Sequence, residues 1–289
     1  MPIAKLKGVD IAYEEAGTGF PMIWCHEFGG SKESWAPQVR YFSRRHRVIT
    51  YNARGYPPSG VPDDWRTYSQ EQQVEDLRML LDHLGIQQAI VGGLSMGGHT
   101  ALGFGLTHPD MCRALIVAGA GTGSANPEMM REDSERRAAV LEAQGMQAMD
   151  GYAKGATRSR YMAKDPQGWK EMYDLFMAHS AKGSANTLRG FQARRPSIYM
   201  LEARLRQLPM PVLIMSGDED EPCLEPSLYI KRTIPRSGLA FLPQADHVIN
   251  ISEPALFNAL VAEFLAQVDA GRWDARSNAS GDTWIGKTS

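Results

Sequence analysis

The segment Ala89–His99, with the sequence A-I-V-G-G-L-S-M-G-G-H, contains the residue whose type and setting best suit nucleophilic chemistry. Ala89–Val91 is typical of a short buried strand, and Gly97–Leu106 of the beginning of a helix. Ser95 lies between them, in the pentapeptide G-L-S-M-G. A sharp strand-to-helix turn strains the backbone of the serine at its apex, so its flanking positions must be small. The hydroxyl then lies at a helix N-terminus, where free N–H groups favour developing negative charge.

A serine nucleophile needs a base within hydrogen-bond reach and an acid that orients this base. The loop Gly217–Pro222 (G-D-E-D-E-P) is rich in acids, and the loop Pro243–His247 (P-Q-A-D-H) ends in a histidine. A third loop, His26–Gly30, could donate backbone N–H groups. Each of these loops follows a predicted strand. Because reactive groups gather at the carboxyl ends of the strands in open α/β sheets, we expect the three loops to meet around Ser95.

The elements that must position these groups are short apolar strands that alternate with amphipathic helices. This rhythm predicts a mostly parallel, doubly wound sheet that is covered by helices on both sides. Amphipathic helices are expected after Ser69 and over Glu253–Val268. The predicted strands are Ile3–Leu6, Asp10–Ala16, Met22–His26, Arg47–Tyr51, Ala89–Val91, Ala114–Ala118, Pro211–Ser216 and Leu239–Leu242.

The strand rhythm stops between Ser124 and about Gln207, where the sequence is rich in methionine and arginine and has helical character. We therefore predict one α/β core made of residues 1–123 and 208–268, with residues 124–207 inserted as a helical cap. Residues 269–289 are polar and aperiodic apart from Trp273 and Trp284, and are expected to form an extended C-terminal tail. The predicted cap helices are Pro127–Gln144, Gln167–Ser180 and Ala185–Arg194.

Five motifs together resemble the α/β-hydrolase superfamily, in its cap-bearing branch of esterases, lactonases, C–C bond hydrolases, epoxide hydrolases and haloalkane dehalogenases. They are H-x-x-G-G at 26–30, N-A-R-G-Y-x-x-S at 52–59, G-L-S-M-G-G at 93–98, G-D-E-D at 217–220 and D-H-x-x-x-x-x-E-P at 246–254. The resemblance implies an α/β-hydrolase fold over roughly residues 11–268.

The same resemblance implies the roles of the residues in the site. Ser95 is then the nucleophile, His247 the general base and Asp220, rather than Asp218, the orienting acid. The backbone N–H groups of Phe28 and Met96 form the oxyanion hole.

Two departures from the usual motifs concern residues that flank the site. Glu27 follows His26 where a glycine is common, which places a side chain in the loop that presents the Phe28 N–H. Asp246 replaces a frequent glycine before His247. A carboxylate there would favour the charged imidazolium if it turned toward the ring, and would face solvent otherwise. We expect His26 to brace the oxyanion loop.

The serine at position 95 argues against the epoxide hydrolases and haloalkane dehalogenases, which resemble this chain but use an aspartate nucleophile. We predict a serine hydrolase that cleaves a small carboxylic ester or lactone through an acyl-enzyme. Two alternatives stay open: hydrolysis of a C–C bond in a vinylogous keto acid, and a small-molecule receptor that retains the triad. Phe28 and the methionine-rich cap favour an uncharged substrate, whereas the cap arginines keep an anionic one open.

Composition excludes several other classes of function. The formal net charge of −2 argues against nucleic-acid binding, and no apolar run reaches the ~18 residues that span a bilayer. The chain begins without a signal-peptide pattern, and Cys25, Cys112 and Cys223 form no C-x-x-C pair, so we expect a cytoplasmic protein. No dinucleotide motif or metal-ligand spacing is present, so we expect no cofactor and no metal. The expected partner is a small-molecule substrate, and a homodimer stays open.

Overall fold

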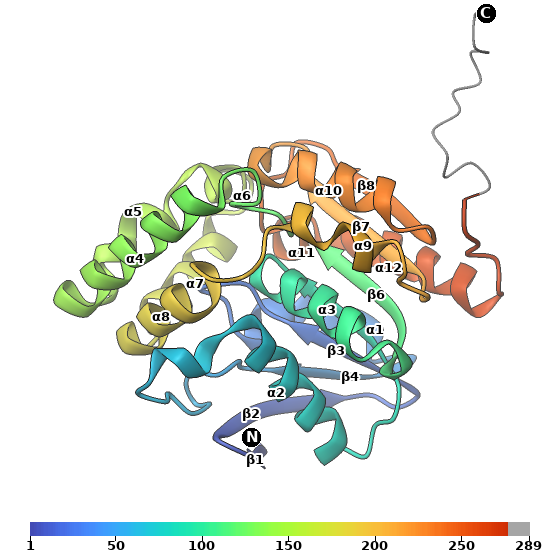
Figure 1. Ribbon diagram of the computed structural model, residues 1–289, viewed down its shortest axis with the longest axis horizontal. Coiled ribbons are helices and arrows are strands. Elements are labelled where there is room, and N and C mark those ends of the chain that lie inside the picture. The colour runs from blue at the N-terminus through green and yellow to red at the C-terminus, as the bar shows by residue number, and fades with distance from the viewer. Residues whose placement is uncertain (277–289) are drawn as a thin grey trace, which may run out of the picture.

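The computed structural model describes residues 1–276 and is built around one eight-stranded sheet (Figure 1). The strand order is β1-β2-β4-β3-β5-β6-β7-β8. The two N-terminal strands pair antiparallel with their neighbours, and every pair from β4 to β8 is parallel. The strands are β1 (Ile3–Leu6), β2 (Val9–Ala16), β3 (Phe20–Cys25), β4 (His46–Tyr51), β5 (Ala89–Leu94), β6 (Cys112–Ala118), β7 (Val212–Gly217) and β8 (Ser237–Leu242).

Helices cover both faces of the sheet, as the predicted doubly wound α/β-hydrolase fold requires. Side chains of a strand alternate between the faces, so Trp24 of β3 packs with Trp35 and Phe257 on one side, while Ile23 joins the core on the other. The core helices are α1 (Ala36–Phe42), α2 (Gln70–His83), α3 (Met96–Thr107), α10 (Glu221–Thr233), α11 (Ile249–Ser252) and α12 (Pro254–Asp269).

The chain between β6 and β7 is helical. Its helices are α4 (Pro127–Gln144), α5 (Asp150–Ala153), α6 (Ser159–Lys164), α7 (Pro166–Met177), α8 (Ala181–Thr187) and α9 (Glu202–Leu205), with a π-helical turn at Leu188–Gln192. The part from α4 to α8 forms the predicted cap at the left of Figure 1, whereas α9 lies beside the core near β7. Short 3-10 turns occur at Met146–Met149, Ala156–Arg158 and Ile198–Leu201 within this segment, and at Lys32–Trp35, Trp65–Tyr68 and Pro109–Met111 in the core.

The two connections between cap and core lie side by side. Ser197 Oγ donates to the carbonyl of Ser124 at 2.8 Å, and the N–H of Ile198 donates to Ser124 Oγ at 3.2 Å. The outgoing connection turns sharply, since Gly119 and Gly121 adopt φ values of +52° and +149° that side chains disfavour.

The residues after α12 pack against the core as far as they are described. The Trp273 indole donates to the carbonyl of Arg236 at 3.1 Å and meets Phe264 edge-on. This part of the predicted tail is therefore attached to β8, whereas Trp284 lies outside the described residues. No helix within residues 1–276 combines the length and apolar character needed to cross a membrane.

Candidate active site

Ser95 occupies the turn between β5 and α3 in a strained backbone conformation, with φ 55° and ψ −114°. The strain is held by neighbouring backbone: the Ser95 N–H donates to the Ala118 carbonyl at 2.8 Å. The glycines of the motif are sterically required. A Cβ on Gly97 would lie 1.9 Å from the Cys25 carbonyl oxygen, and one on Gly93 would lie 2.1 Å from the Gly97 carbonyl oxygen. Only a hydrogen fits at either position, which explains the spacing of the pentapeptide.

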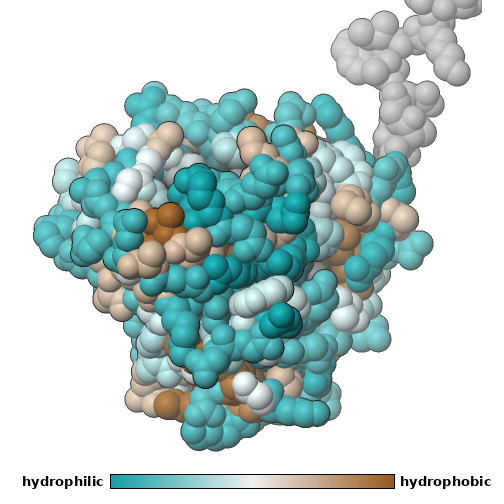
Figure 2. All heavy atoms as spheres, turned by 60° about the vertical axis from the view of Figure 1, so that its left-hand side comes forward, coloured by the Kyte–Doolittle hydropathy of each residue, from teal (hydrophilic) through white to brown (hydrophobic). Residues whose placement is uncertain are grey.

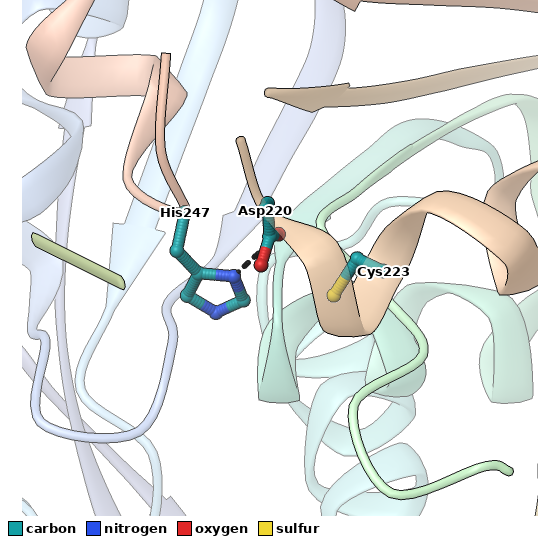
Figure 3. Close-up of side chains that lie close together, drawn as sticks. All are labelled: Asp220, Cys223 and His247. Atoms are coloured by element: carbon teal, nitrogen blue, oxygen red, sulfur yellow. Dashed lines mark hydrogen bonds and ion pairs between the residues drawn. The ribbon is translucent and has the colours of Figure 1, made fainter. Parts of the chain in front are cut away.

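His247 and Asp220 form a buried hydrogen-bonded pair at the ends of β8 and β7. Their side chains come from two loops and meet with 2.7 Å between His247 Nδ1 and Asp220 Oδ2 (Figure 3). Burial lowers the pKa of His247, but the Asp220 carboxylate and its hydrogen bond outweigh this effect, and the pKa lies well above its usual value. The bond fixes the ring, and leaves Nε2 on the side away from the carboxylate to act as a base.

The other acids of these loops bind elsewhere. Asp218 is exposed and accepts from the Ala245 N–H at 3.2 Å, so the structure places Asp220 and not Asp218 against the imidazole. Asp246 is buried and therefore does not face solvent. Its Oδ2 accepts from the Tyr161 N–H at 3.0 Å, at the start of α6. The expectation that Asp246 faces solvent is therefore wrong. Its carboxylate attaches α6 to the loop of His247 and also interacts electrostatically with His247, so its effect on the imidazole stays a prediction.

His26 braces the loop His26–Gly30, as expected. His26 Nδ1 lies 2.8 Å from the Glu27 carbonyl and Nε2 accepts from the Ala53 N–H at 2.9 Å; burial lowers the pKa of His26 to about 4. Within residues 1–276, the N–H groups of Phe28 and Met96 have no backbone or side-chain acceptor. Glu27 is buried away from the cavity lining and accepts from Ser34 Oγ at 3.2 Å.

Ser95 and His247 line one cavity of about 180 Å³ between core and cap. Its lining is mixed, with apolar side chains beside hydroxyl, amide and charged groups. The remaining lining residues are Phe28, Thr122, Met130, Asp133, Ser134, Arg137, Tyr152, Thr157, Leu188, Gln192 and Arg195. Of the methionines in the methionine-rich cap, Met130 lines this cavity.

Cys223 is a residue of this site that the sequence analysis missed. Its sulfur lies on the first turn of α10 and turns toward the His247–Asp220 pair, so that one ligand atom from each of the three residues lies within 4.8 Å of the others (Figure 3). Its position three residues after Asp220 on a helix was the available signal. The group does not fit a metal well. Burial raises the pKa of the Cys223 thiol, so the metal-binding thiolate is disfavoured, and a cation would have to replace the Nδ1 proton.

The order of serine, aspartate and histidine along the chain, each at a strand end of a mostly parallel sheet, is that of the α/β hydrolases. The sequence as a whole agrees with this class. The chain belongs to the alpha/beta hydrolase fold family, whose profile matches residues 21–254.

Characterised proteins similar to this chain have several hydrolytic activities. It is 28% identical to 2-hydroxymuconate semialdehyde hydrolase of Pseudomonas putida, over 89% of this chain and 90% of the relative. It is 26% identical to 3-oxoadipate enol-lactonase 2 of Acinetobacter baylyi, over 83% of this chain and 86% of the relative. Among solved structures, a malate-bound thermophilic esterase from Thermogutta terrifontis has a TM-score of 0.81 and 26% identity, over 90% and 94% of the two chains. The protein is thus a hydrolase of the α/β family.

Proposed function

We propose that the protein is a serine hydrolase that cleaves a small carboxylic ester or lactone. The observation that carries this proposal is the one cavity shared by Ser95 and a histidine that Asp220 orients. Ser95 Oγ attacks the carbonyl carbon while His247 accepts its proton, and the Phe28 and Met96 N–H groups stabilise the oxyanion. His247 then gives the proton to the leaving alkoxide. A water deprotonated by the same histidine releases the acid and restores Ser95.

The test is hydrolysis of a graded panel of acyl esters and lactones by the wild type and by Ser95→Ala. The variant should remain folded and retain only the roughly 10³–10⁴-fold acceleration that binding and the oxyanion hole provide. Ser159→Ala, which changes an exposed cap serine, is the matched control and should behave as wild type. A chelator should leave the wild-type rate unchanged, since the mechanism uses no metal. Near-normal turnover by folded Ser95→Ala would exclude the proposal.

The receptor alternative predicts a different time course. A receptor that keeps the triad would be occupied or acylated once and then stall, whereas an enzyme releases many product molecules per serine. Counting product against active serine in a single progress curve separates the two. A plateau at one product molecule per protein molecule would mean that the protein is a receptor and not a hydrolase.

C–C bond hydrolysis stays the second candidate, because 2-hydroxymuconate semialdehyde hydrolase is among the similar proteins. Both reactions use Ser95 and His247, so only substrate competition separates them. A neutral ester or lactone and a vinylogous diketo acid are offered at equal concentration. A kcat/KM at least a hundredfold higher for the keto acid would favour the C–C reaction. We also place the protein in the cytoplasm, where its three unpaired cysteines would stay reduced.

A further inference from the structure

Two arginines line the cavity that contains Ser95: Arg137 is paired with Asp133, whereas the charge of Arg195 has no acidic partner. Arg195 follows the π-helical turn. Its Nη2 donates to the Thr122 carbonyl at 2.5 Å, whereas Nη1 is buried without a hydrogen-bond acceptor. No carboxylate within residues 1–276 pairs with this guanidinium. Burial lowers the pKa of Arg195 to about 10, so it remains charged at neutral pH.

The other charged groups around Arg195 do not supply a counter-charge. Asp133 also lines the cavity, but its carboxylate is bound by Arg136 and by Arg137 Nε, which lies at 2.5 Å. His99, on the helix after Ser95, has a pKa well below its usual value, first because of burial and then because of the Arg195 charge. It is therefore neutral and cannot compensate the guanidinium. The cavity carries a net positive charge at Arg195.

The arginines on the outer side of the cap show the contrast. This face is mostly hydrophilic, with small scattered hydrophobic areas (Figure 2). Several partly or fully exposed arginines of the cap lie in ion pairs with neighbouring acids: Arg131 with Glu128, Arg189 with Glu142, and Arg194 with Glu135 at 2.8 Å. Such pairs are expected on a solvated surface and contribute little to stability. Among residues 1–276, Arg158 and Arg204 of the predicted cap also lack an ion pair, but of these unpaired arginines Arg195 is the one that lines the cavity with Ser95.

A buried, unpaired donor on a charged group is costly, and the cost is recovered when an anionic acceptor binds. We propose that Arg195 holds a carboxylate of the substrate, so that the preferred ester or lactone is an anion. This inference rests on the proposed hydrolysis at Ser95 and specifies its substrate class. It reverses the preference for an uncharged substrate that Phe28 and the cap methionines suggested. A guanidinium suits this role because its N–H groups match the geometry of a carboxylate.

The test compares two esters of similar shape, monoethyl succinate and ethyl levulinate. The second replaces the carboxylate of the first by a neutral acetyl group. Wild type should prefer monoethyl succinate by kcat/KM. Arg195→Gln should lower kcat/KM for monoethyl succinate roughly ten- to a hundredfold, the range for a hydrogen bond to a charged group, and change ethyl levulinate by less than threefold. Arg195→Lys, which keeps the charge, should retain part of the preference.

Arg194→Gln is the matched control, because Arg194 is the adjacent residue but is exposed and paired with Glu135. It should leave the preference intact. A wild type that prefers ethyl levulinate would overturn the inference. So would an equal loss on both esters in Arg195→Gln and Arg195→Lys, because Arg195 would then only anchor the Thr122 loop.

Succinate binding, measured by calorimetry, separates this inference from the proposed function. Wild type and Ser95→Ala should bind succinate, and Arg195→Gln should bind it at least tenfold more weakly. If neither ester is hydrolysed but succinate binding depends on Arg195, the anion site stands and the hydrolase proposal fails. If esters are hydrolysed but succinate binding ignores Arg195, the anion site fails alone.

Discussion

Replacing Asp220 by asparagine should remove most of the turnover while the fold stays in place, because the two side chains are nearly equal in size. Asp220 Oδ2 lies 2.7 Å from His247 Nδ1, which keeps the proton on Nδ1 and leaves Nε2 able to accept one. An asparagine can turn its NH₂ group toward Nδ1 and so favour the tautomer protonated at Nε2. A histidine in that tautomer cannot take the proton of Ser95.

The expected loss in kcat is about 10³–10⁴-fold, by analogy with the same change in a serine-protease triad. The pH profile gives a second readout. Burial lowers the pKa of His247 and the Asp220 carboxylate raises it, so removal of the carboxylate leaves the lowering effect. The acid limb of kcat/KM, which reports the free base, should therefore move to lower pH.

The assay is steady-state hydrolysis of one active ester from pH 4 to 9, with circular dichroism as a check of folding. Asp218→Asn is the matched control, because Asp218 lies in the same loop, is exposed and contacts a backbone N–H. It should change kcat less than threefold. A loss below tenfold in Asp220→Asn, or equal losses in both variants, would refute the assignment of Asp220 as the orienting acid.

Two further predictions concern the support of the site. Asp246→Ala should lower the free energy of unfolding by about 2 kcal/mol in urea titrations, because the Tyr161 N–H loses its acceptor. The same variant should move the acid limb of the kcat/KM profile far less than Asp220→Asn. A comparable shift would mean that Asp246 acts on the imidazole. His26 has a pKa of about 4 in the folded protein and about 6.5 in the unfolded chain. Between these values the unfolded chain binds the proton more readily, so the free energy of unfolding decreases as the pH is lowered. The wild type should lose about 2 kcal/mol between pH 7 and 5 that His26→Gln does not lose, and equal pH dependence of both proteins would contradict this reasoning.

Much of the fold was predictable because local signals and tertiary structure agree. The cap helix α4 was predicted at its observed bounds, Pro127–Gln144, since its N-cap Asn126 and terminal Gly145 mark both ends. Helix α10 was not predicted, because Pro222 and Pro226 interrupt a helical pattern in the sequence. The segment predicted as one helix at Ala185–Arg194 contains a π-helical turn, which no residue pattern distinguishes from an α-helix.

The chain order of the site groups was also readable, because each follows a strand in a recognisable motif. The sequence could not show which partners the flanking side chains find. Asp246 binds the start of α6, 85 residues away along the chain, and this contact depends on how the cap is seated. The isolation of Arg195 is likewise invisible, since adjacent Arg194 has the same residue type and an acidic partner. Both are consequences of tertiary packing.

The paired connections at Ser124 and Ser197 have a consequence for how such a protein diversifies. The chain leaves the core after β6 and returns before β7 at neighbouring points, and the two strands pair directly, with Ile116 beside Leu213. A segment whose ends lie close together can be lengthened, shortened or exchanged without disturbing its host. The intervening cap is therefore a cassette. Recombination at these two points would give the same core a new substrate range in one step, and leave the Ser95 turn and the sheet unchanged.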